Sequence, residues 1–90
     1  MSQVQATVEI VNRMGLHARP ASEFVRLAGR FHADIRVEKD GLEVNGKSIM
    51  GVLMLAAECG SALTIHAHGD DGPEALDALA ALVRAGFEES

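Results

Sequence analysis

Two hydrophobic periodicities follow one another along this chain of 90 residues, and their order limits the folds that it can adopt. Apolar residues at every second position are typical of a strand with one buried face. Four segments show this alternation, at residues 4–10, 34–38, 42–44 and 63–68. Asp40 and Gly41 stand between the second and third segments and predict a tight hairpin turn.

Three further segments show the spacing of an amphipathic helix. The first covers about residues 18–30. Ser48 is a favourable N-cap for the second, which we expect to end at Gly60. Pro73 begins the third, whose apolar stripe continues to Phe87. The predicted order of elements is therefore βαββαβα.

This order predicts one four-stranded sheet with helices on a single face, because every strand has one apolar side and the longer helices each have one apolar stripe. The order of the strands within the sheet does not follow from the pattern. A chain of this length forms one small domain, which we assign to residues 1–90. Hydrophobic residues make up 48% of the chain, with no Trp or Tyr and three Phe, so the core must be mainly aliphatic.

Charge and cysteine content exclude several classes of function. The net charge of −5 argues against nucleic acid as a partner and suits docking to basic protein surfaces. Cys59 is alone, so an intramolecular disulfide is impossible. A reducing cytoplasm is expected, and a disulfide between two chains is the alternative. The start of the chain lacks the features of a signal peptide, and its longest apolar run is too short to span a membrane. We therefore expect a cytoplasmic protein.

Residues 15–21 read GLHARPA and form the most informative motif of the chain. Pro20 is favoured in the first turn of a helix, where backbone N–H groups and the helix dipole attract anions. An imidazole at His17 can accept a group, and the guanidinium of Arg19 offers paired donors to phosphate oxygens. This pattern favours reversible phosphorylation of His17, which we expect to be exposed. The simpler interpretation is a histidine that only caps the helix or is solvated at the surface, beside an ordinary surface arginine.

A second motif, NGKSIMGVL, covers residues 45–53. Apolar residues here exceed what one buried stripe of a short helix can use, and exposed methionines such as Met50 and Met54 are typical of docking surfaces. Burial of Met50 in the core is the alternative. A phosphate on Ser48 would stand at a helix N-terminus and at the edge of this apolar surface. We expect such a phosphate to alter partner choice without unfolding the helix.

The two motifs, their separation and the order of elements resemble HPr, the histidine-containing phosphocarrier family of the bacterial phosphoenolpyruvate-dependent phosphotransferase system. The resemblance covers nearly all of the chain. It implies an α+β fold, the open-faced β-sandwich, with a four-stranded antiparallel sheet and three helices on one face. It also implies that His17 takes a phosphoryl group from phosphorylated enzyme I and passes it to enzyme IIA-type acceptors.

The resemblance assigns roles to further residues. Arg19 would bind the phosphoryl oxygens, and Ser48 matches a regulatory serine that an HPr kinase/phosphorylase modifies in some bacteria. Ile49, Met50 and Leu53 match the apolar surface on which partners dock. We expect a stoichiometric carrier, not an enzyme, with no cofactor and no bound metal, and a monomer that docks transiently. Residues 46–57 combine features of the serine-regulated and the nitrogen-related branches, so sugar uptake and nitrogen regulation both stay open.

Two other classes of function compete with the carrier. A regulatory binding module would use Ser48 while His17 stays idle, although the presence of His17 argues against it. A hydrolase using His17 as a base would need a nucleophile and a concave pocket, and Ser22 lacks an evident orienting acid.

The remaining histidines have a structural explanation. His66 and His68 share one strand face but provide too few ligands for a structural zinc site, and nothing fixes His32 as a third. We therefore interpret both strand histidines as solvated.

Cys59 and the acidic pair before the last helix also need no reactive or catalytic role. Cys59 has no basic neighbour, so we predict a small packing residue near a helix end. Asp70 and Asp71 precede Pro73, where capping explains them.

Overall fold

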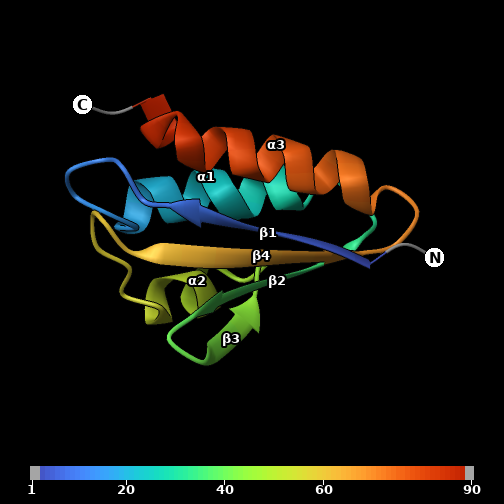
Figure 1. Cartoon of the computed structure of the whole chain (residues 1–90), viewed down its shortest axis with the longest axis horizontal. Helices are drawn as coiled ribbons and strands as arrows, with labels where there is room; N and C mark the ends of the chain where they lie inside the picture. Colours follow the sequence, from blue (N-terminus) through green and yellow to red (C-terminus); the bar gives the residue numbers. More distant parts are fainter. Residues whose placement is uncertain (1–2, 89–90) are drawn as a thin grey trace.

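The computed structural model describes residues 3–88 and contains one antiparallel sheet of four strands in the order β1-β4-β2-β3. The strands are β1 (Gln3–Glu9), β2 (Asp34–Lys39), β3 (Leu42–Asn45) and β4 (Ala62–His68). The helices are α1 (Ala18–Ala28), α2 (Ile49–Met54) and α3 (Gly72–Arg84), followed by a short 3₁₀ turn η1 (Gly86–Glu88). Figure 1 shows α1 and α3 lying side by side along the sheet, with α2 near β3.

The helices cover one face of the sheet and leave the other open, which confirms the predicted α+β open-faced β-sandwich. Along β4, Leu63 and Ile65 are fully buried, whereas Thr64 and His66 alternate with them on the opposite face. Phe24 of α1 contributes to the same core. In the described part of the chain, no helix is long and apolar enough to cross a membrane.

The turn between β2 and β3 forms where the sequence predicts it. Asp40 and Gly41 both have positive φ angles, 52° and 85°, as a two-residue hairpin of the favoured twist requires. This turn pairs Lys39 with Leu42 and fixes the register of the hairpin.

The end of α2 differs from the prediction. The helix stops at Met54 and not at Gly60, because the chain turns at Ala56, whose φ is 48°. The backbone beyond this point bonds to another segment: Ala57 accepts a hydrogen bond from the amide of Leu16 at 2.8 Å. Continuing the helix would remove that contact. Gly60 instead belongs to the turn that leads into β4.

The ends of α1 and α3 also differ from the predicted ones. Helix α1 ends at Ala28, two residues before Arg30. Phe87 is buried as expected, but it lies in η1 with a φ of 55°, outside the continuous helix. Gly86, with a φ of 65°, redirects the backbone after α3, so Phe87 reaches the core from a turn.

Asp71 does not cap α3 with its side chain, contrary to the prediction. Its two carboxylate oxygens accept the backbone N–H groups of His32 and Ala33, each at 2.8 Å. The start of α3 is thereby tied to the segment that leads into β2. These bonds, the one from His32 foremost, lower the pKa of Asp71 below its ordinary value.

We expect Asp71→Asn to destabilise the protein at neutral pH, because an amide offers one acceptor where the carboxylate uses two. A lowered folded-state pKa means that the contribution of Asp71 is fully present above the unfolded pKa of about 3.9. That contribution is lost as the pH falls through the folded-state value. Urea unfolding from pH 7 downward should therefore show the two proteins converging in acid. The matched control is Asp70→Asn at the exposed neighbour, and equal pH dependence in all three proteins would contradict the assignment.

Candidate functional site

His17 occupies the N-cap position of α1 with an extended backbone (φ −76°, ψ −174°). Its carbonyl oxygen accepts the first helical bond, from the amide of Ala21 at 3.0 Å. Its side chain makes no capping bond, so the capping interpretation of this histidine is wrong. The imidazole therefore stands at the positive end of an 11-residue helix whose first turn has no acidic residue. It is half-buried, and therefore more covered than the exposed position that we predicted.

Hydrogen bonds from one side chain and from the backbone hold the loop before His17. The buried side chain of Asn12 donates to the carbonyl oxygen of Gly15 at 2.8 Å, and the amide of Leu16 bonds to Ala57. Gly15 has a φ of 68°, and a Cβ there would lie 2.4 Å from the carbonyl oxygen of Ala57. Sequence reasoning missed Asn12, since a single polar residue in a predicted loop gives no sign of its burial.

Arg19 lies in the same first turn and reaches into solvent. Its side chain is 77% exposed, and its Nε lies 3.8 Å from Oε1 of Glu23. An exposed i,i+4 ion pair of this length is weak. The guanidinium can therefore leave Glu23 to bind an incoming anion at little cost. Pro20 is buried beneath this turn and packs the start of the helix against the core.

Ser48 caps α2 as predicted: its Oγ accepts the amide of Gly51 at 3.1 Å. The preceding turn is also closely fixed. The amide of Gly46 bonds to the carbonyl oxygen of Ile35 at 2.7 Å, and the Nζ of Lys47 bonds to the carbonyl oxygen of Phe31 at 2.6 Å. The side chain of Ser48 is half-buried, at the junction between the sheet and α2.

Helix α2 presents an apolar surface to solvent. Met50 is 67% exposed and Ile49 is also exposed, while Leu53 is half-buried against the core. Met54 is exposed as well, and so is Met14 in the loop before His17. The core interpretation of Met50 is therefore wrong. The sequence motif did not point to Met14, because its exposure depends on how the loop folds.

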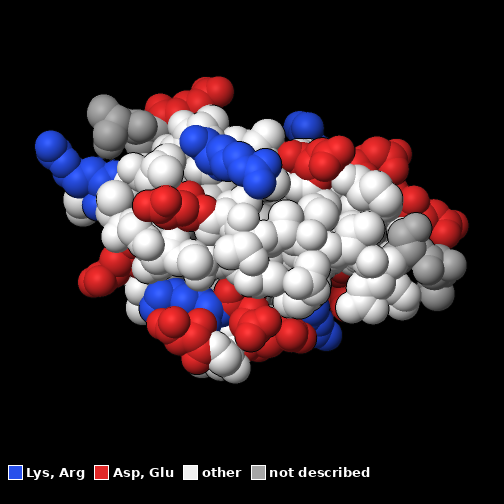
Figure 2. All heavy atoms as spheres, viewed as in Figure 1, with Lys and Arg blue, Asp and Glu red and all other residues white. Residues whose placement is uncertain are grey.

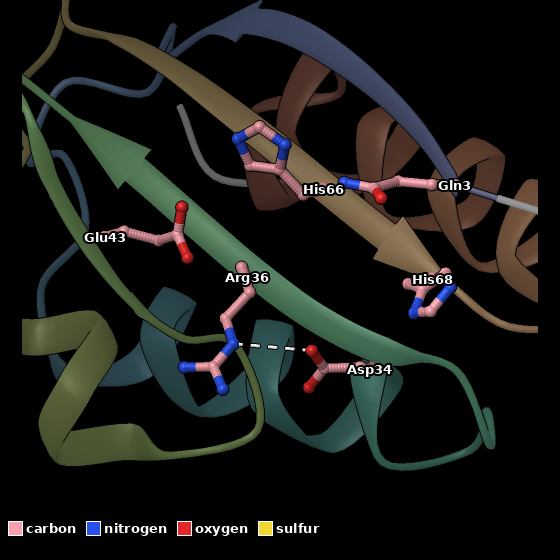
Figure 3. Close-up of a pocket in the computed structure, with 6 residues that line it drawn as sticks. All are labelled: Gln3, Asp34, Arg36, Glu43, His66 and His68. Carbon is pink, nitrogen blue, oxygen red and sulfur yellow. Dashed lines mark hydrogen bonds and ion pairs between the residues drawn. The ribbon is translucent and has the colours of Figure 1, made fainter.

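Two other candidate residues differ from expectation. Cys59 is exposed, so it is not a packing residue; the turn after α2 holds it at the surface, with Sγ 3.8 Å from the carbonyl oxygen of Val11. His66 is half-buried and its Nε2 lies 3.3 Å from Oε1 of Glu38, so it is not simply solvated. Figure 3 shows a polar hollow on the open sheet face, lined by Gln3, Asp34, Arg36, Glu43, His66 and His68.

Comparison with known proteins agrees with this geometry. The family model described as the PTS HPr component phosphorylation site matches residues 4–85. A phosphocarrier protein HPr from Cupriavidus necator is 44% identical over 86 residues, covering 96% of this chain and 97% of that protein. The chain therefore belongs to the HPr family of phosphocarriers.

Two solved structures give the same result. The crystal structure of a phosphocarrier protein HPr from Bacillus anthracis is 54% identical, covers 92% of this chain and 99% of its own, and superimposes with a TM-score of 0.88. A crystal structure of Crh, a catabolite repression protein of Bacillus subtilis, is 49% identical with a TM-score of 0.75 and covers 92% and 95% of the two chains. That structure is a dimer with a swapping domain.

We expect Gly15→Ala to loosen the loop that carries His17. The substitution combines a left-handed backbone, which costs a residue with Cβ about 1–2 kcal/mol, with a clash worth about 1–3 kcal/mol. Chemical unfolding should show the summed loss, and the amide of Leu16 should exchange its hydrogen faster. Gly60→Ala is the matched control, because Gly60 has a φ of 92° and a Cβ there would meet no atom of residues 3–88 within 4 Å. Equal losses in the two variants would show that the contact with Ala57 does not matter.

Proposed function

We propose that this protein carries a phosphoryl group on His17, which it receives from phosphorylated enzyme I and passes to enzyme IIA-type acceptors. The observation that carries the proposal is the position of His17 at the N-cap of α1, which sets its imidazole beside the positive end of the helix. Membership of the HPr family supports the same role.

The transfer needs one nucleophile and stabilisation of charge. A neutral imidazole nitrogen of His17 attacks the phosphorus of the donor, an N–P bond forms, and the bond from phosphorus to the donor breaks. Arg19 and the first N–H groups of α1 stabilise the phosphoryl oxygens. The partner supplies the remaining stabilisation, so this chain alone performs no turnover and acts as a stoichiometric carrier without a cofactor. We propose that it works in the cytoplasm as one domain.

The exposed apolar surface of α2 gives the partners a place to dock, through Ile49, Met50 and Leu53. A phosphate on Ser48 would place negative charge beside this surface. Because Oγ of Ser48 accepts from Gly51 at the helix start, phosphate oxygens can take over that bond and leave α2 folded. An HPr kinase/phosphorylase is the partner that we propose for this step.

A regulatory module without phosphoryl relay is the second candidate. The resemblance to Crh, a catabolite repression protein, favours it. The dimer of that relative also bears on the oligomeric state: we propose a monomer during transfer, and light scattering at working concentration distinguishes it from a dimer. Sugar uptake and nitrogen regulation are both compatible with the site.

His17→Ala should abolish phosphoryl acceptance from enzyme I. The experiment is intact-mass analysis after incubation with phosphoenolpyruvate and enzyme I, followed by acid. The wild-type chain should gain one acid-labile phosphoryl group, and the variant none, because it lacks the accepting nitrogen. His68→Ala, on the open face of β4, is the matched histidine control and should accept normally.

Other outcomes of this experiment are equally informative. Acceptance by His17→Ala would refute the site. An acid-stable phosphate on Ser48 from an HPr kinase, without any acid-labile group, would establish the regulatory module instead. Circular dichroism of His17→Ala should match the wild type, because the side chain makes no capping bond to α1.

Arg19→Lys should slow the transfer by about tenfold, the equivalent of about 1.4 kcal/mol. A lysine keeps the positive charge but cannot give two parallel hydrogen bonds to a phosphoryl group. Rapid-quench measurement of the transfer from enzyme I tests this. Arg26→Lys, on the same helix and exposed, should leave the rate unchanged. Equal rates for Arg19→Lys and the wild type would mean that charge alone suffices.

A further inference from the structure

Three side chains from three neighbouring strands meet on the open face of the sheet. Glu38 lies on β2, Glu43 on β3 and His66 on β4, and one ligand atom from each lies within 4.8 Å of the others. Figure 3 shows Glu43 and His66 on the strands that flank β2. Figure 2 shows acidic and basic side chains gathered around β2 and β3, below a mostly uncharged area over β1 and β4. We call these three residues the Glu-Glu-His cluster.

The register of the sheet forces the two glutamates together. The hairpin turn places Glu38 directly opposite Glu43 across β2 and β3. Two like charges in direct cross-strand register destabilise a sheet. His66 pairs with Arg36 in the register of β2 and β4, which places it diagonally beside Glu38. The fold thus brings two carboxylates and one imidazole to one point at an electrostatic cost.

The neighbouring cations do not offset that cost. Arg36 pairs with Asp34 at 3.4 Å, and Lys39 pairs with Asp40 at 3.4 Å. Within residues 3–88, the side chain of Glu43 makes no hydrogen bond or ion pair. A positive charge placed among the three side chains would therefore relieve the repulsion between the glutamates.

The distances suit a small metal ion bound by nitrogen and oxygen. In a tetrahedral zinc site with bonds near 2.0 Å, neighbouring ligand atoms are about 3.3 Å apart. Nε2 of His66 and Oε1 of Glu38 already lie 3.3 Å apart. Glu43 is exposed on the edge strand, so its side chain can rotate to complete the set. Imidazole among the ligands favours zinc and similar transition metals over calcium or magnesium.

We propose that Glu38, Glu43 and His66 bind one Zn²⁺ ion, with water at the fourth position. The ion joins the short edge strand β3 to β2 and β4 and neutralises the glutamate pair. The site lies on the sheet face opposite the helices, so it does not depend on His17 or on phosphoryl transfer.

The test is a titration of the full chain with ZnCl₂, followed by calorimetry and by amide chemical shifts. We expect one equivalent to bind, with shifts centred on the Glu-Glu-His cluster and a higher unfolding temperature. His66→Ala should weaken this binding by at least about tenfold, since even outer-shell partners of a metal contribute that much. His68→Ala is the matched control and should bind as the wild type. All of these variants are made in a Cys59→Ser background, because the exposed thiol of Cys59 could bind Zn²⁺ outside the cluster.

A second variant separates a metal ligand from a structural residue. Glu43→Gln removes one of the two opposed charges, so the metal-free protein should be at least as stable as the wild type. The same variant should lose the rise in unfolding temperature that Zn²⁺ causes. The proposal fails if Zn²⁺ causes no shift at the cluster, if His66→Ala binds normally, or if His68→Ala weakens binding equally. It also fails if Glu43→Gln keeps the full effect of Zn²⁺.

Discussion

The contact between two loops determines where His17 stands and how much of the remaining chain can be helical. The backbone of Ile10 bonds to both Gly60 and Ser61, at 2.7 and 2.9 Å, and Leu16 bonds to Ala57. These bonds continue the pairing of β1 and β4 beyond the sheet. They use the backbone groups that a longer α2 would need, and they leave room only for a glycine at position 15. The short α2 and the fixed start of α1 are thus two results of one constraint.

In this arrangement the backbone positions His17, whereas the exposed side chains around it stay free to move. Backbone bonds hold the position of His17, so in the proposed transfer a partner would meet an imidazole that is already placed, and binding would require little ordering. Arg19 and Met50 are largely exposed. Their freedom suits contacts that exist only while a partner is bound, since Arg19 can change its partner and methionine adapts to several surfaces. In the proposed transfer, a more rigidly held Arg19 would oppose the passage of the phosphoryl group from donor to acceptor.

Local sequence patterns predicted the fold class, the hairpin turn and the cap at Ser48, because each depends on residues close in the chain. They failed where distant segments decide. The end of α2 depends on the hydrogen bond between Leu16 and Ala57. The carboxylate of Asp71 accepts the backbone N–H of His32 and does not cap its own helix. The opposition of Glu38 and Glu43 was predictable from the two-residue turn. The approach of His66 was not, because it requires β4 to lie beside β2.

The two faces of the sheet are constrained differently: one by packing against the helices, the other by charge and strand register. The helix-covered face tolerates few changes, since its aliphatic side chains fill one core. The open face is constrained mainly by charge and register. Strand β4 pairs on both sides, whereas β3 pairs on one side and has four residues. In the proposed zinc site, His66 and Glu38 lie on central strands and already contact each other, whereas Glu43 lies on the edge strand and can adjust. A ligand set with two fixed atoms and one adjustable atom can accept ions of slightly different radius, so its selectivity must come from ligand chemistry more than from cavity size.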